Sequence, residues 1–184
     1  KEAAKKYSPH IYENLFLRID KRQGEPKELS LANHVVICGH GRVGRHISRI
    51  LTLAQKPFIV VDFNQKVVSD LKKSAQPVLF GDPTDYEVLD YAQVDKAAAI
   101  IIATPDRHSQ EMIIENALRL NKNIVIICRS HFEEDKESLY ALGAHSIVQP
   151  EFEAGLYMAG QLLKVFGFSA EEIGEYLRRV RKEG

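Results

Sequence analysis

Short runs of apolar residues alternate with amphipathic stretches from residue 33 almost to residue 150. Most of the runs are continuous rather than alternating, which is typical of strands buried on both faces of a parallel sheet. The stretches between them repeat apolar residues at helical spacing, which predicts helices with one buried face. Strands and helices in strict alternation predict an α/β fold with a doubly wound sheet of six mainly parallel strands. The predicted strands are His34–Cys38, Phe58–Val61, Pro77–Phe80, Ala97–Ala103, Ile124–Cys128 and Ser146–Val148.

The ends of several helices are marked by residue pairs. A serine or threonine followed three residues later by a glutamate is the pattern of a capping box at a helix start. A glycine just after the last apolar position, as at Gly143, is typical of a helix end. The three predicted capping boxes are Thr84 with Glu87, Ser130 with Glu133, and Ser169 with Glu172.

Two segments outside the alternation divide the chain into three predicted parts. Residues 1–32 are rich in charge and predict a linker or a short lead-in helix. Residues 33–150 form the alternating unit. Residues 151–184 predict two extra helices separated by Gly167, the first with an apolar stripe that one small domain would not cover. That stripe consists of Leu156, Ala159, Leu163 and Phe166.

Charge and composition exclude some classes of protein. The 184 residues hold 25 basic and 25 acidic side chains, whereas a protein that binds duplex nucleic acid normally carries a basic excess. The longest apolar run, Ala97–Ala103, is much shorter than the roughly 20 residues of a membrane-spanning helix. The two cysteines lie in apolar runs, which favours a reducing compartment over a disulfide framework.

A glycine-rich loop follows the first predicted strand directly. The pattern G-x-G-x-x-G between a strand and a helix is the fingerprint of a dinucleotide-binding, Rossmann-type unit. Gly39 is expected to permit the tight turn, Gly41 to let a phosphate approach the backbone, and Gly44 to let helix and strand pack closely. The helix start offers N–H groups and the positive end of its dipole to an anion. The loop consists of Gly39, His40, Gly41, Arg42, Val43 and Gly44.

An acidic residue stands where this fingerprint needs one. Asp62 ends the second strand, 18 residues after Gly44. A carboxylate there accepts hydrogen bonds from the ribose hydroxyls of a nucleotide and repels a 2′-phosphate. We include the next residue, Phe63, in the predicted site. The alternative is a ligand-free glycine turn beside a surface aspartate.

Other candidate residues lie in the loop or at strand ends. The Arg42 guanidinium could hold a phosphate bidentately or simply face solvent. Asp82 and Thr104 end the third and fourth strands, on the carboxyl edge where such folds bind ligands, although Asp82 could equally be a turn residue before Pro83. Arg129 ends the fifth strand and could contact a ligand or pair with nearby acids.

The sequence predicts no catalytic residue and no metal site. No two histidines have the i, i+4 spacing of a helical zinc site, and there is neither a G-x-S-x-G nor a Walker motif. An NAD-dependent oxidoreductase remains the alternative because it uses the same glycine loop, but it also needs a substrate pocket and an acid or base. Only about 35 residues follow the last predicted strand, and the chain contains no Tyr-x-x-x-Lys pair.

Several segments together resemble the RCK (TrkA-N) regulatory domain over about Asn33 to Leu163. The segments are HVVICGHGRVGRHI, VVD, VLFGDPTDYEVLDYAQVDKAAAIIIAT, IVIICRS and LGAHSIVQPE. RCK domains belong to or assemble with potassium channels, Trk and Ktr transporters, and Kef-type cation/proton antiporters. The Gly-Arg-x-Gly form of the loop, Gly81-Asp82 and Cys128-Arg129 look most similar to the Kef-type proteins.

The resemblance implies a nucleotide sensor rather than an enzyme. It implies NAD(H), AMP, ADP or ATP as a non-catalytic ligand, a homodimer formed through the C-terminal helices, and a cytoplasmic position beside the membrane. It also implies that residues 1–32 connect to a membrane transport domain of a longer chain, and that Glu151 lies near a dimer interface. The implied ligand contacts are phosphate at Gly39, Gly41, Arg42 and Gly44, ribose at Asp62, and nucleoside at Asp82 and Thr104.

Overall fold

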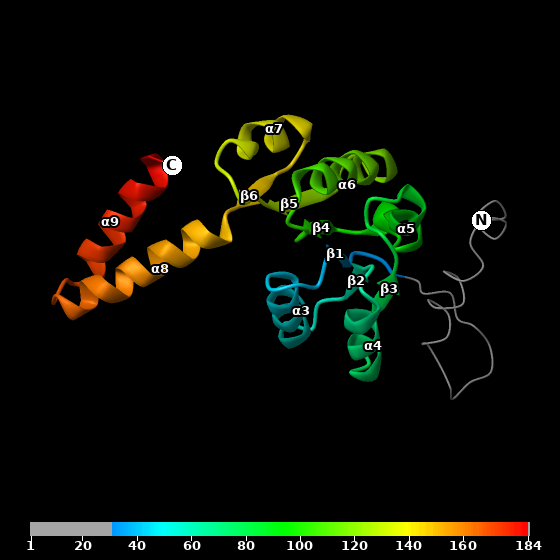
Figure 1. The fold of residues 1–184 in the computed structure, drawn as a ribbon, viewed down its shortest axis with the longest axis horizontal. Helices are drawn as coiled ribbons and strands as arrows, with labels where there is room; N and C mark the ends of the chain where they lie inside the picture. Colours follow the sequence, from blue (N-terminus) through cyan, green and yellow to red (C-terminus); the bar gives the residue numbers. More distant parts are fainter. Residues whose placement is uncertain (1–30, 184) are drawn as a thin grey trace.

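The computed structural model describes residues 31–183, so nearly all of the expected lead-in segment lies outside the described residues. Its centre is one six-stranded sheet in the order β3-β2-β1-β4-β5-β6 (Figure 1). Every pair of neighbouring strands is parallel, which confirms the doubly wound fold. The strands are β1 Val35–Cys38, β2 Phe58–Asp62, β3 Val78–Phe80, β4 Ala99–Ile102, β5 Val125–Arg129 and β6 Ser146–Val148.

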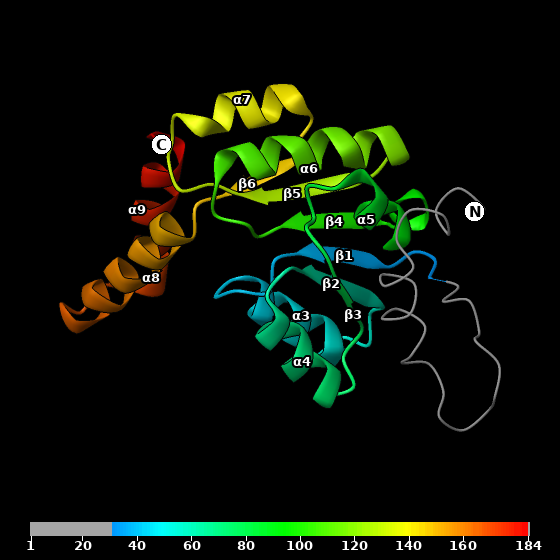
Figure 2. The same cartoon turned by 45° about the vertical axis from the view of Figure 1, so that its right-hand side comes forward.

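Helices cover the two faces of the sheet unequally. The first two pack on one face, and the next three pack with a short 3₁₀ turn on the other (Figure 2). The last two form a hairpin that extends away from the sheet (Figures 1 and 2). The helices are α3 Gly44–Leu53, α4 Gln65–Lys73, α5 Tyr86–Tyr91, η1 Val94–Lys96, α6 Arg107–Leu120, α7 Asp135–Leu142, α8 Pro150–Val165 and α9 Ala170–Glu183.

The face under α3 and α4 is closed over only half of its width. Ile37 on β1 is fully buried beneath these helices. Its partners across the sheet, Ile101 and then Ile127, point to the same face because paired residues of parallel strands share a side. Both are only partly buried, and farther along this face Val125 and Val148 are 41% and 40% exposed. The sheet therefore leaves an open apolar surface over β4, β5 and β6.

The predicted helix caps have mixed outcomes. The capping box at Ser169 is confirmed, because its backbone N–H donates to Glu172 Oε2 at 2.8 Å and its Oγ accepts from the Glu172 N–H at 3.3 Å. Gly143 is the C-cap of α7 with φ of 114°, as expected. The boxes at Thr84 and Ser130 are wrong, because local turns take their polar groups. Asp82 accepts from Thr84, Ser130 donates to the Phe132 carbonyl, and the helices begin later, at Tyr86 and Asp135.

The C-terminal hairpin is held together along its own length. Gly167 turns the chain between α8 and α9 with φ of 83°, and Arg181 pairs with Glu153 at 2.6 Å. Of the predicted stripe, Leu156 is buried and Phe166 is 70% exposed. The hairpin presents further apolar side chains to solvent, namely Tyr157, Met158, Leu162 and Val165. Within residues 31–183 no helix is both long and apolar enough to span a bilayer.

Candidate functional site

The glycine loop joins the end of β1 to the start of α3 in the predicted geometry. Gly39 has φ of 90°, which favours glycine, and its N–H donates to the Val61 carbonyl at 2.9 Å. A Cβ at Gly44 would overlap the Gly39 carbonyl oxygen, so helix and loop approach too closely for any other residue. A Cβ at Gly41 would meet no atom within 4 Å. The loop is therefore tight against the protein at both ends and open at Gly41, where a ligand could approach the backbone.

The first turn of α3 borders this open point. Its N-cap, Val43, has no side chain that bonds the turn's N–H groups, and the turn contains no acidic residue. The positive end of the helix dipole and these N–H groups suit a phosphate. Arg42 is exposed on the loop and forms no ion pair within residues 31–183, so its guanidinium is free to close over an anion.

Asp62 lies beside the loop and is only 8% exposed, so it is not the surface aspartate of the alternative interpretation. Its Oδ2 accepts from the His40 backbone N–H at 2.7 Å, and its Oδ1 accepts from the Asn64 N–H at 2.8 Å. Each carboxylate oxygen has a second lone pair for a further donor. The carboxylate is thus oriented by the backbone before any ribose hydroxyl reaches it.

Two buried polar groups lie on the other side of β1. Thr104 follows β4, packs 3.5 Å from the position of a Cβ on Gly39, and its buried Oγ1 has no hydrogen-bond partner among the described residues. Arg129 ends β5, and its buried Nε is also without a partner there. Its Nη2 lies 3.0 Å from His131 Nε2 and 3.6 Å from Glu151 Oε1. An unpaired buried polar group costs about 1–3 kcal/mol, so both groups suit a ligand that supplies a partner.

Other predicted site residues lie farther from this centre. Asp82 is exposed at the edge strand, and its Oδ1 accepts from the Thr84 backbone N–H at 2.9 Å and from the Thr84 hydroxyl at 2.7 Å. This is the turn role that the sequence left open. Phe63 is 65% exposed beyond the end of β2.

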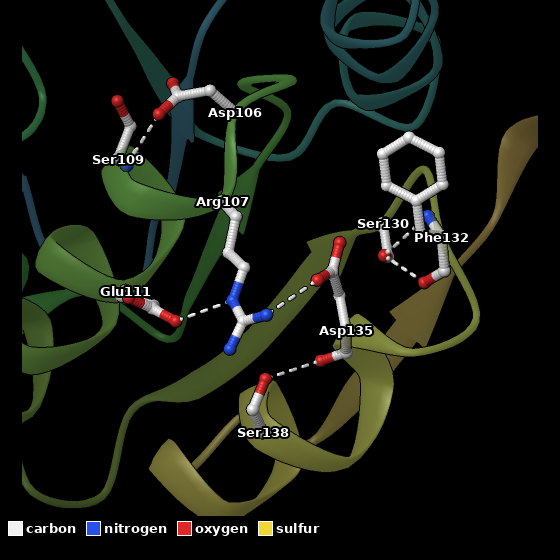
Figure 3. A network of polar contacts seen from close by, with 8 residues as sticks. All are labelled: Asp106, Arg107, Ser109, Glu111, Ser130, Phe132, Asp135 and Ser138. Carbon is white, nitrogen blue, oxygen red and sulfur yellow. Dashed lines mark hydrogen bonds and ion pairs between the residues drawn. The ribbon is translucent and has the colours of Figure 1, made fainter.

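A polar network that the sequence did not reveal joins the loops after β4 and β5. Arg107 at the start of α6 donates to Glu111 at 2.8 Å and to Asp135 at 3.0 Å, and Asp135 is buried at the start of α7 (Figure 3). Asp106 caps α6 by accepting from the Ser109 N–H at 2.9 Å. The network ties together the loops that follow Thr104 and Arg129. The only sequence signal was Asp106 as an N-cap, because the acid that pairs with Arg107 lies 28 residues away.

The histidine of the loop faces two ways. Its backbone N–H bonds Asp62, whereas its imidazole Nε2 lies 2.8 Å from the Ser48 hydroxyl on α3. Burial lowers the pKa of His40, Asp62 opposes that shift and Arg45 adds to it, so the ring is neutral near pH 7.

The described residues offer neither a metal cluster nor a reactive thiol. No three histidine, cysteine or acidic side chains of residues 31–183 gather in a metal-binding arrangement. Burial raises the pKa of Cys128 to about 12 and raises that of Cys38 as well, which keeps both thiols protonated.

A family model described as the TrkA-N domain matches residues 35–150. Among similar proteins, "Probable potassium channel protein 2" of Methanocaldococcus jannaschii is 32% identical over 147 residues, which cover 78% of this chain and 42% of that protein. "Putative K(+) efflux antiporter KefB" of Alkalimonas amylolytica is 26% identical over 151 residues, which cover 82% of this chain and 23% of that protein. The chain thus spans less than half the length of either relative.

Solved structures show the same fold. The AMP-bound C-terminal domain of a Shewanella denitrificans Kef protein has a TM-score of 0.72 at 20% identity, covering 82% of this chain and 92% of that one. The GsuK channel bound to NAD has a TM-score of 0.66 at 22% identity, covering 84% of this chain and 27% of that one.

Proposed function

The chain belongs to the TrkA-N (RCK) domain family, and on that premise we propose that it is a non-catalytic domain that senses an adenine nucleotide and regulates a cation transporter or channel in the membrane. We propose that residues 33–150 bind the nucleotide, that residues 151–184 pair two copies, and that residues 1–32 lead to the membrane part. The domain would then lie on the cytoplasmic face of the membrane.

The observation that carries the nucleotide proposal is the contact between Asp62 and the glycine loop. Asp62 Oδ2 accepts the His40 N–H at 2.7 Å, so the ribose-binding carboxylate and the phosphate-binding loop are held in one rigid unit. The adenosine ribose would bond Asp62, and the phosphates would lie at Gly41 and the start of α3. Because Asp62 repels a 2′-phosphate, we expect NAD(H) or an adenine mononucleotide rather than the phosphorylated cofactor.

The unpaired groups at Thr104 and Arg129 favour a ligand that extends past the loop. Along the carboxyl edge, Asp62 on β2 comes first, then the loop after β1, then β4 and β5. A mononucleotide bound at Asp62 and the loop ends near β1, whereas the second half of a dinucleotide reaches β4. We therefore propose that NAD(H) gains a hydrogen bond from the Thr104 hydroxyl that AMP does not make.

The open apolar surfaces support a homodimer. The chain has an uncovered sheet face at Ile101, Ile127 and Val148, and a protruding hairpin whose Leu162 and Val165 are exposed. In a two-fold dimer each copy can offer one surface and receive the other, so both become buried at once. We propose that the hairpin of one copy covers the open face of β4, β5 and β6 of the second.

We propose a Kef-type cation/proton antiporter as the attached membrane protein, and a potassium channel or a Trk or Ktr transporter as the second candidate. The channel is favoured by the 32% identity to the archaeal protein, and the antiporter by the relative from Alkalimonas amylolytica. In either case the nucleotide would act by binding one arrangement of the dimer more tightly than another, which biases the membrane part.

Calorimetric titration of the Asp62→Ala variant tests the nucleotide proposal. Loss of hydrogen bonds to a charged group costs about 1.5–3 kcal/mol, so affinity for AMP and NADH should fall roughly 10- to 100-fold. Asp82→Ala is the matched control and should bind almost normally, because Asp82 bonds only its own turn. Circular dichroism would verify that both variants fold. Equal affinity of wild type and Asp62→Ala would refute the ribose assignment, and sustained NADH turnover would favour the oxidoreductase alternative.

A further inference from the structure

We propose that His40 is a positioning residue for the nucleotide site, which acts by locking the loop to helix α3 through Ser48 rather than by touching the ligand with its ring. The inference rests on the proposed nucleotide function and identifies what holds that site in its binding geometry.

One residue connects three elements here. The His40 N–H donates to Asp62 at the end of β2 at 2.7 Å, and its Nε2 lies 2.8 Å from Ser48 Oγ in α3. Ser48 is buried in the second turn of the helix. The ring contact therefore fixes the same residue whose backbone orients the ribose-binding carboxylate.

Counting protons assigns the donor in the ring contact. The Ser48 hydroxyl donates its single hydrogen to the Arg45 carbonyl at 3.0 Å. Ser48 Oγ must then accept from His40, so Nε2 carries a hydrogen. Burial keeps the ring neutral, which leaves Nδ1 without one. His40 is thus a neutral, Nε2-protonated imidazole with a defined donor role.

The ring faces the helices and not the carboxyl edge. His40 and Ser48 line a cavity of about 460 Å³ between α3 and α4, together with Thr52 of α3 and Val67 and Leu71 of α4. The ligand groups proposed above lie on the loop backbone and at strand ends. The imidazole therefore needs no contact with the nucleotide to influence it.

A double-mutant cycle on the whole 184-residue chain, with NADH binding followed by calorimetry, tests this role. His40→Ala and Ser48→Ala should each weaken binding about fivefold, and the double variant should also lose about fivefold, because both remove the same interaction. His40→Gln should stay within about twofold of wild type, since its side-chain amide can donate to Ser48 Oγ.

Two results of the cycle would overturn the proposal. If His40→Ala weakens binding and Ser48→Ala does not, the ring contacts the ligand itself. If the losses multiply to about 25-fold in the double variant, the two residues act independently.

A second measurement needs no nucleotide, so its failure is distinct from failure of the proposed function. Nitrogen-15 NMR of the ligand-free chain should show His40 with Nε2 protonated and Nδ1 unprotonated, and Ser48→Ala should speed exchange of the His40 amide hydrogen. The opposite tautomer, or unchanged amide exchange, would contradict the lock. Absence of NADH and AMP binding by a wild type with the expected tautomer would instead refute the nucleotide function.

Discussion

The two halves of the sheet differ in how completely the chain itself satisfies them. Strands β1, β2 and β3 are covered on both faces, and the Asp62 carboxylate at their carboxyl edge has a backbone partner for each oxygen. Strands β4, β5 and β6 are covered by α6 and α7 on one face only, and Thr104 and Arg129 at their edge each keep a buried polar atom unpaired. The first half is complete within one chain, whereas the second is suited to completion by a ligand and a second copy.

The largest expected effect comes from placing a charge on the hairpin. An unpaired carboxylate buried in an apolar interface costs several kcal/mol, so Leu162→Asp should weaken the dimer at least about 100-fold and leave monomers in sedimentation at micromolar concentration. Met112→Asp is the matched control, because Met112 is an exposed apolar side chain on α6, which covers the opposite face of the sheet. A dimer that survives Leu162→Asp but not Met112→Asp would move the interface to the other face.

A pair of glycine variants separates fold from ligand binding in the first half. Gly44→Ala should destabilise the chain by about 1–3 kcal/mol in urea unfolding, because its Cβ overlaps the Gly39 carbonyl oxygen. Gly41→Ala meets no protein atom within 4 Å and should unfold like wild type, yet bind NADH and AMP more weakly because the methyl group stands where a phosphate approaches. Normal nucleotide affinity of Gly41→Ala would place the phosphates elsewhere.

The smallest effect concerns the unpaired hydroxyl of the second half. Thr104→Val keeps the shape of the side chain and removes the Oγ1 atom that lacks a partner. One neutral hydrogen bond contributes about 0.5–1.5 kcal/mol, so NADH affinity should fall roughly two- to tenfold while AMP affinity stays unchanged. Equal losses for both ligands would mean that a mononucleotide already reaches Thr104.

The sequence predicted most where a single local rule decides the outcome. Continuous apolar runs located all six strands, because strands buried on both faces tolerate little else. The glycine spacing and Asp62 located the loop and its acid, because tight turns and close approach admit few residue types. The capping boxes at Thr84 and Ser130 failed because a nearer turn captured the same polar groups.

Contacts between distant segments were beyond the sequence. The pairing of Arg107 with Asp135 depends on how two loops approach each other, and the contact of His40 with Ser48 depends on the rotation of α3 against the loop. The open face of β4, β5 and β6 also appears only in three dimensions. Its strands carry the same apolar runs as the covered ones, and what differs is that no helix of the same chain reaches them.

A native mass spectrum of the purified chain tests the central claim most directly, because it reports both the number of copies and any retained ligand. The account predicts a dimer that carries an adenine nucleotide on each copy, with the nucleotide lost and the dimer kept in Asp62→Ala. A monomer that binds neither NADH nor AMP when these are added would contradict it.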